Sequence, residues 1–401
     1  MIFLNRALRR SGALAAAALL AAAALATVSA PAYAGTGGTD LELTVVGTTI
    51  AEGADRKVGW AKITNRGANT PAELTVLADL SALDFTKVFA APAGDAECSG
   101  EGDAGPVAWT CEVPAELIPG PGETLDFPVV LLKLDPDAAG YRAPVTYTIS
   151  SPDDTTPGNN TRTADVVFSE SGGVDLGVEV PDVKETLDPE TGEVTGPLVA
   201  GGTSAVVGWI YNWGDAIAKG IKVTVRLPER VTFAETESDC VYTADNRTAT
   251  CSYPSVVLMP LSDEVDEEFV AAFYWPITVA DGVEPPASLT GGSWTAEALG
   301  QVSPDARVAT TPADLPANVT MVSAQDAGVT EIDESDNVDG FSVIVSGEGG
   351  GSGGGLPVTG VPAGLLGGVG LAVIVAGGVL LLLARRRRVV LVAPADEKSA
   401  L

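Results

Sequence analysis

The stretch IKVTVRL, residues 221–227, alternates apolar and polar side chains at every position. Successive side chains of a β-strand point to opposite faces, so this pattern predicts a strand with one apolar and one polar face. Residues 41–45 and 145–149 alternate in the same way. Short stretches of this kind, separated by glycine, proline, asparagine and aspartate from Asp40 to Val345, predict an all-β protein built as a β-sandwich.

Two successive parts of the chain carry the same landmarks in the same order, which predicts tandem domains over residues 39–170 and 174–346. The boundary is expected at Gly172-Gly173. The second copy is longer, and we expect insertions around residues 187–192 and between residues 275 and 316. The paired landmarks are Asp40-Leu41 with Asp175-Leu176, Val58-Gly59-Trp60 with Val207-Gly208-Trp209, Asn65-Arg66-Gly67 with Asn212-Trp213-Gly214, Cys98 and Cys111 with Cys240 and Cys251, and, loosely, Asn159-Asn160 with Asp336-Asn337.

Residues 1–34 have the three parts of a secretory signal peptide. Arg6, Arg9 and Arg10 give a positively charged start, and an alanine- and leucine-rich stretch follows. Small residues end the segment at Ala32-Tyr33-Ala34, so we expect cleavage after Ala34. A membrane anchor is the alternative, but the apolar run is shorter than the roughly 20 residues that span a bilayer.

The C-terminus has four parts in order. A glycine-rich tether, residues 347–355, precedes the pentapeptide Leu356-Pro357-Val358-Thr359-Gly360. The uncharged residues 361–384 that follow are long enough to cross a membrane as a helix. Arg385, Arg386, Arg387 and Arg388 open the basic tail, residues 385–401, and favour its retention in the cytoplasm.

This order resembles the cell-wall sorting signal of Gram-positive surface proteins, which joins an LPxTG pentapeptide to an apolar span and a basic stop. The resemblance implies that a sortase recognises Leu356 to Gly360, cuts after Thr359 and attaches Thr359 to peptidoglycan. The protein would then be held in the membrane only before sorting. The tail after Arg388 is longer than is usual in the family, and a plain single-span membrane protein remains the alternative.

The two copies resemble the conserved repeat domain of bacterial surface proteins, an Ig-like sandwich related to cell-adhesion domains. Residues 39–170 fit its pattern well. Residues 174–346 fit less closely, because Asp336-Asn337 stands where the first copy has Asn159-Asn160. The resemblance implies two Ig-like sandwiches on a cell surface, and it assigns no common activity.

The charge of the chain limits its partners. The formal net charge is −30, and residues 35–359 hold 51 of the 53 acidic residues but only 15 of the 23 basic ones. Nucleic acid would be repelled, because phosphate binding needs clustered lysine and arginine. The chain contains no histidine, which excludes imidazole catalysis and histidine metal ligands.

Four cysteines in an exported chain should be oxidised. Three pairings are possible, and the repeat favours Cys98 with Cys111 and Cys240 with Cys251. A metal site is the alternative, but no CxxC spacing occurs.

Acidic clusters raise a calcium hypothesis, although none has the spacing of a calcium-binding loop. Turn chemistry and a solvated acidic surface explain the same residues. The candidates are Asp135 and Asp137, the cluster Glu331-Asp333-Glu334-Asp336, and residues 263–268.

Other chemistry has weaker support. No pair of carboxylates is singled out for hydrolysis, and no motif marks the lysine–asparagine crosslink known in other wall-anchored Ig-like domains. Six tryptophans could stack on sugars, but strand positions favour the core, and Trp213 is the best candidate for an exposed ring. The six are Trp60, Trp109, Trp209, Trp213, Trp275 and Trp294.

The sequence thus predicts a non-enzymatic protein of the cell wall with a structural or adhesive role. We assign it no catalytic residue, cofactor or metal. Its expected partners are the sortase, peptidoglycan and an unidentified surface ligand. A carbohydrate- or calcium-binding surface module is the alternative.

Overall fold

The computed structural model describes residues 38–93, 97–101, 107–188, 193–261, 270–302, 322–323 and 329–347. Over these residues the protein is all-β, with two single-turn 3-10 helices at Ala115–Leu117 and Pro157–Asn159, so the predicted class is confirmed. No helix in this part of the chain is long and apolar enough to cross a membrane. The predicted signal peptide, sorting motif, span and tail lie outside the described residues.

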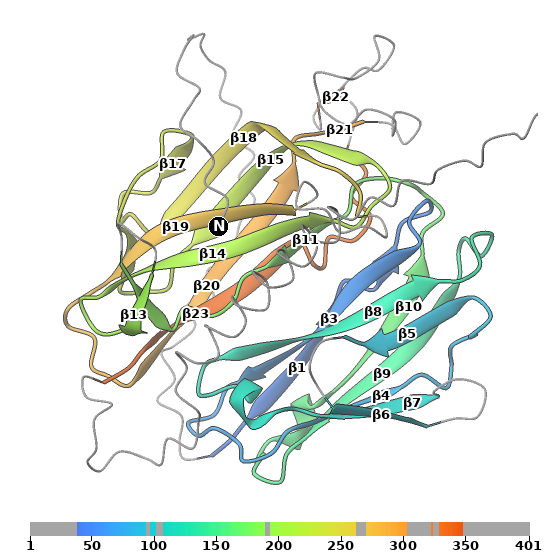
Figure 1. Ribbon diagram of the computed structural model, residues 1–401, viewed down its shortest axis with the longest axis horizontal. Coiled ribbons are helices and arrows are strands. Elements are labelled where there is room, and N and C mark those ends of the chain that lie inside the picture. Colours follow the sequence, from blue (N-terminus) through green and yellow to red (C-terminus); the bar gives the residue numbers. More distant parts are fainter. Residues whose placement is uncertain are drawn as a thin grey trace, which may run out of the picture. The chain divides into compact units, whose positions relative to one another are not determined.

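The first ten strands form two sheets that pack face to face (Figure 1). One sheet has the order β1-β3-β8-β5 and the other the order β2-β10-β9-β4-β7-β6. The bounds are β1 (Leu41–Val46), β2 (Thr49–Ile50), β3 (Arg56–Asn65), β4 (Thr75–Asp79), β5 (Val88–Pro92), β6 (Glu97–Glu101), β7 (Ala108–Glu112), β8 (Thr124–Lys133), β9 (Arg142–Ser150) and β10 (Thr161–Phe168).

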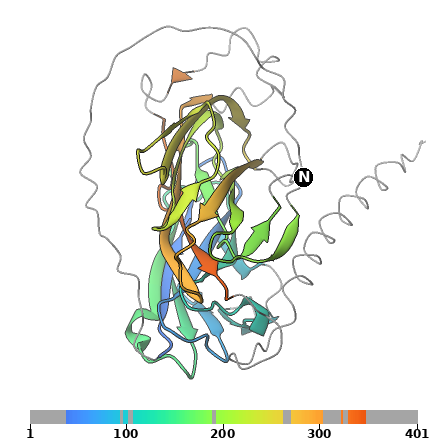
Figure 2. The same ribbon diagram turned by 90° about the vertical axis from the view of Figure 1, so that its left-hand side faces the viewer.

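The later strands repeat this arrangement (Figures 1 and 2). One sheet has the order β11-β14-β19-β16, and the other has the order β17-β18-β15-β20-β23. The bounds are β11 (Leu176–Glu179), β14 (Thr203–Asn212), β15 (Ile217–Arg226), β16 (Val231–Phe233), β17 (Cys240–Tyr242), β18 (Thr248–Leu258), β19 (Val270–Val279), β20 (Ala287–Ala298) and β23 (Val338–Val345).

All strands of the first sandwich except β2 have a counterpart in the second. In sheet order, β1-β3-β8-β5 corresponds to β11-β14-β19-β16, and β10-β9-β4-β7-β6 corresponds to β23-β20-β15-β18-β17. The repeated landmarks of the sequence therefore mark one topology built twice.

The extra length of the second copy is only partly where the sequence predicted it. The hairpin of β12 (Glu185–Leu187) and β13 (Val194–Pro197) flanks the first predicted insertion. The second prediction, residues 275–316, is wrong in its bounds, because β19 and β20 belong to the common topology. The added segment follows β20 and contains β21 (Gly300–Val302) and β22 (Val322–Ser323).

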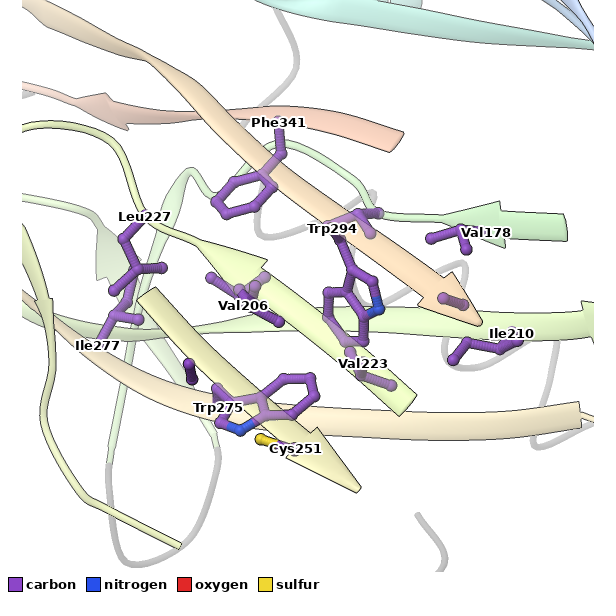
Figure 3. Packing of buried hydrophobic residues seen from close by; sticks show 14 of the residues in the cluster. Val178, Val206, Ile210, Val223, Leu227, Cys251, Trp275, Ile277, Trp294 and Phe341 are labelled. Carbon is purple, nitrogen blue, oxygen red and sulfur yellow. The ribbon is translucent and has the colours of Figure 1, made fainter. Parts of the chain in front are cut away.

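The alternating residues of the sequence build both cores. On β15, Ile221, Val223 and Val225 are fully buried, while Arg226 is exposed. Between the sheets of the second sandwich, the rings of Trp275 and Trp294 meet edge to face with centroids 4.6 Å apart (Figure 3). Such aromatic pairs contribute both buried area and a specific geometry, which fixes how the two sheets face each other.

Candidate functional site

Each cysteine pair forms a disulfide within its own sandwich, in the pairing that the repeat favours. Cys98 is bonded to Cys111 and Cys240 to Cys251. In each case the two residues lie directly opposite on neighbouring strands, so the bond ties one hairpin. The residues of the sorting motif, with Thr359, lie outside the described part of the chain, as do Ala34 and the four arginines.

The start of the first sandwich is held by a small polar network that we call its opening corner: Asp40, Asp154, Asn159 and Asn160. The Asn159 amide donates to Asp40 Oδ1 at 2.9 Å, and the Asn160 amide donates to Asp154 Oδ2 at 2.8 Å. Asp154 also accepts the backbone N–H of Leu41. Each carboxylate of this corner therefore receives a hydrogen bond from inside its own sandwich.

The second sandwich has the corresponding opening corner: Asp175, Glu331, Asp336 and Asn337. Glu331 accepts the backbone N–H of Leu176 at 2.9 Å, as Asp154 does for Leu41. The carbonyls of Asn160 and Asn337 accept from equivalent strands, β9 and β20. The difference is at Asp336, which stands in the position of Asn159 and has no amide to donate to Asp175.

Lys57 of the first sandwich supplies the missing donor. Its Nζ lies 2.8 Å from both carboxylate oxygens of Asp175 and 3.2 Å from Oδ2 of Asp336. Asp333 is 3.3 Å from the same nitrogen. The side chains of Lys57 and Asp175 are both fully buried, and Oδ2 of Asp336 has this ion pair but no hydrogen bond. One ammonium group thus serves three carboxyl groups away from water.

The register of β3 places Lys57 there. Lys57, Ala61 and Ile63 share the inward face of this strand, and Lys57 stands at its beginning, where the core ends. The corresponding residue of β14 is Val206, next to the shared Val-Gly-Trp triplet, and it is a fully buried part of the second core. A lysine on an inward face is tolerated only where acids and hydrogen bonds compensate its burial.

We call the contacts between the two sandwiches the joint. Backbone groups contribute to it in addition to Lys57. The N–H of Thr49 donates to Asp333 Oδ2 at 2.9 Å, and the N–H of Gly47 donates to Ser335 Oγ at 2.9 Å. Asp215 bridges the N–H groups of Gly53, in the first sandwich, and Gly173. Several separate hydrogen bonds thus hold the backbone of the first sandwich to that of the second at the joint.

A second lysine on the outer face of β3 extends the joint. Lys62 lies 3.1 Å from its cross-strand neighbour Asp126 and 2.6 Å from Asp339 of β23. The N–H of Thr124 donates to Asp182 at 2.8 Å. Charged contacts therefore tie β3 and β8 to the second sandwich at separate points.

The joint changes the proton affinity of its groups. Burial alone would lower the pKa of Lys57, but the three neighbouring aspartates outweigh it and raise that pKa above its ordinary value. Burial raises the pKa of Asp336 despite the neighbouring ammonium group, and it raises the pKa of Glu331 to about 8. Burial acts on Asp333 too, but Lys57 and hydrogen bonds from Ser335 and Thr49 hold its pKa below the usual range.

The acidic candidates among the described residues do not form a calcium site. In the cluster from Glu331 to Asp336, the ammonium group of Lys57 lies among the carboxyl groups where a cation would lie. Asp135 accepts the N–H of Asp137 at 3.0 Å, which is turn chemistry. Over the described ranges, no three acids or cysteines are arranged to hold a metal ion. Residues 263–268 lie outside those ranges.

The tryptophans offer no exposed platform. Trp109, Trp275 and Trp294 are buried in the cores, and Trp60 and Trp209 are half-buried. Trp213, the best candidate for an exposed ring, is half-buried as well. Its ring stacks on Tyr211 at a centroid distance of 5.7 Å, and its indole nitrogen is buried.

Comparisons with known proteins give remote similarities only. No family model and no curated protein matches the chain. Among solved structures, the major pilin subunit of Bacillus cereus is 10% identical with a TM-score of 0.22, and the match covers 71% of this chain and 66% of the pilin. The C-terminal domain of the AgI/II polypeptide BspA of Streptococcus agalactiae is also 10% identical, with a TM-score of 0.20 and coverage of 71% and 97%. A red sea bream transglutaminase gives a TM-score of 0.22, with 11% identity and coverage of 77% and 32%. Scores this low assign no function.

Proposed function

We propose that the protein is a non-enzymatic component of the bacterial cell wall that displays two Ig-like sandwiches in a fixed mutual orientation. The observation that carries this proposal is the joint, where Lys57 is fully buried among three aspartates of the second sandwich. A flexible display would need only a linker, because domains in one chain move by default unless a substantial interface holds them. Burying charged groups costs free energy unless close pairing and hydrogen bonds compensate for the lost water.

Display on the wall follows from the ends of the chain. In this proposal the signal peptide exports the protein, the span at residues 361–384 holds it in the membrane, and a sortase transfers Thr359 to peptidoglycan. The glycine-rich tether keeps the pentapeptide clear of the second sandwich. The acidic surface keeps the exported part soluble and away from nucleic acid and anionic membrane.

The test is cell fractionation before and after digestion of the wall with a muralytic enzyme. We expect the wild-type protein in the wall fraction, with a mass that ends at Thr359. Thr359→Ala should shift the protein to the membrane fraction, while the tether variant Ser352→Ala should behave as the wild type. A wild-type protein that stays in the membrane with its tail uncut would instead be an ordinary single-span membrane protein.

A further inference from the structure

The joint contains more carboxyl groups than cations. Asp175, Asp333 and Asp336 lie around Lys57. Glu331 lies next to this group, where it accepts the backbone N–H of Leu176 in β11. If all four acids were ionised, three negative charges would be left without a cation. Like charges at such short range in a buried site are not all sustained, so one or more of the acids takes a proton.

The second cluster repeats this imbalance. Lys62 faces Asp126 and Asp339, and Glu179 of β11 lies near both while accepting a hydrogen bond from the hydroxyl of Tyr211 at 2.9 Å. Three acids again share one ammonium group. The two clusters come from different faces of β3, so the excess of acid is a property of the joint and not of a single turn.

We propose that closure of the joint takes up protons, so that the two sandwiches are locked together in mildly acidic surroundings and loosen as the pH rises above neutrality. When the sandwiches separate, water reaches these acids and they release the protons. The lock therefore responds to pH with no histidine. This inference concerns the joint alone and does not depend on attachment to the wall.

The directions of the pKa shifts agree with proton uptake on closure. Burial raises the pKa of Asp175, Asp336 and Asp126, and it raises the pKa of Glu331 to about 8. An acid whose pKa is higher in the closed state stabilises closure fully below its open-state pKa, and that stabilisation is lost as the pH rises through the closed-state value. The affected window runs from the ordinary carboxyl range up to about pH 8.

The other charged groups at the joint do not reverse the effect. The raised pKa of Lys57 stabilises closure until the pH exceeds the ordinary lysine range, above the window. The lowered pKa of Asp333 acts at the acidic end, where its contribution is lost as the pH falls. Lys133 donates to the carbonyls of Ala51 and Glu52 in its own sandwich, so these hydrogen bonds do not depend on closure of the joint.

The experiment follows the relative motion of the sandwiches in the full chain, purified in detergent. Dyes are attached to cysteines introduced at two exposed positions, Leu117 in the first sandwich and Glu229 in the second, and energy transfer is measured from about pH 5 to about pH 9. We expect one narrow distribution in acid and a reversible broadening in alkali. Each proton taken up changes the ratio of closed to open joint by up to about tenfold per pH unit.

Asp336→Asn is the informative variant, because it installs the residue that the first sandwich uses at Asn159. Its joint should close, since the amide can donate to Asp175, but its pH response should be weaker. Asp137→Asn, on an exposed turn, is the matched control and should respond as the wild type. A wild-type distribution that does not change with pH, or an unchanged response in Asp336→Asn, would overturn the proposal. So would an intact mass lower by one water, which would mean that Lys57 and Asp175 are joined covalently.

Discussion

The ammonium group of Lys57 lies 2.8 Å from both carboxylate oxygens of Asp175, so a side chain of the first sandwich completes the opening corner of the second. In the first sandwich the amide of Asn159 donates the corresponding hydrogen bond to Asp40. The replacement of that asparagine by Asp336 creates the need for an external cation. The same exchange that makes the second copy a poorer match to the repeat thus joins it to the first.

Lys57→Met should destabilise the protein strongly. The methionine fills the same space but leaves Asp175, Asp333 and Asp336 buried without a cation. Removing one partner of a buried ion pair typically costs about 3–5 kcal/mol. Urea unfolding near neutral pH measures the change, and two transitions in place of one would show that the sandwiches have become independent.

Lys87→Met is the control for this variant. Lys87 pairs at 3.8 Å with Asp84 at the surface, where such a pair contributes little. Equal stability of the two methionine variants would show that the buried cluster is not what joins the sandwiches.

Val206→Lys tests the cost of an unpaired buried charge from the other side, by adding a cation instead of removing one. Val206 is the second sandwich's counterpart of Lys57, but it is a fully buried part of an apolar core. A lysine there would be buried without compensation, so we expect loss of folding of the second sandwich or a large fall in its unfolding temperature. Val206→Met, which keeps the site apolar, should be tolerated much better. Similar circular dichroism melts for both variants would contradict the argument.

Reduction of the disulfides should lower the unfolding temperature without separating the chain into subunits. Each bond joins directly opposed residues and closes a short loop, with sequence separations of 13 and 11 residues. A loop of that size contributes about 3 kcal/mol through its effect on the unfolded chain. Calorimetry with and without reductant measures the loss, and peptide mapping under oxidising conditions checks the pairing. A peptide that links Cys98 to Cys240 would show that the pairing is wrong.

The sequence was sufficient for what depends on local pattern. Alternation on β15 and the shared triplets gave the class and the repeat, because strand faces and Asn-x-Gly turns are determined by neighbouring residues. Asn65 and Asn212 each accept the N–H two residues on, at 2.9 and 3.1 Å. Each also donates to two carbonyls of its own sandwich, one four residues on and one far along the chain.

The joint was missed because its partners are far apart in the chain. Asp175 was recognised as a landmark and Asp336 as part of an acidic cluster, but Lys57 is 118 positions from Asp175. Two signals were present: an inward-facing lysine in a chain poor in lysine, and an aspartate in place of the repeat's asparagine. The bounds of the second insertion failed for another reason, since no landmark lay between the cysteines and the closing strand to fix β20.

Gly208→Ala should disrupt the second core. Gly208 lies on β14 opposite Trp294, and a Cβ at this position would be 2.7 Å from the indole ring. Trp294 is fully buried against Trp275, so it has no room to retreat. Overpacking of this kind typically costs about 1–3 kcal/mol. Thermal unfolding of the purified protein measures the change.

The matched control is Gly340→Ala on β23. Its added Cβ would meet its nearest neighbour, the carbonyl oxygen of Gly292, at 3.7 Å, an ordinary contact, so stability should change little. A smaller side chain at position 294 should relieve the clash, and Trp294→Leu should therefore cost less in the Gly208→Ala background than in the wild type. That coupling is measured by a double-mutant cycle. Strictly additive effects would mean that Gly208 is required for a property of the β14 backbone and not for the space that Trp294 occupies.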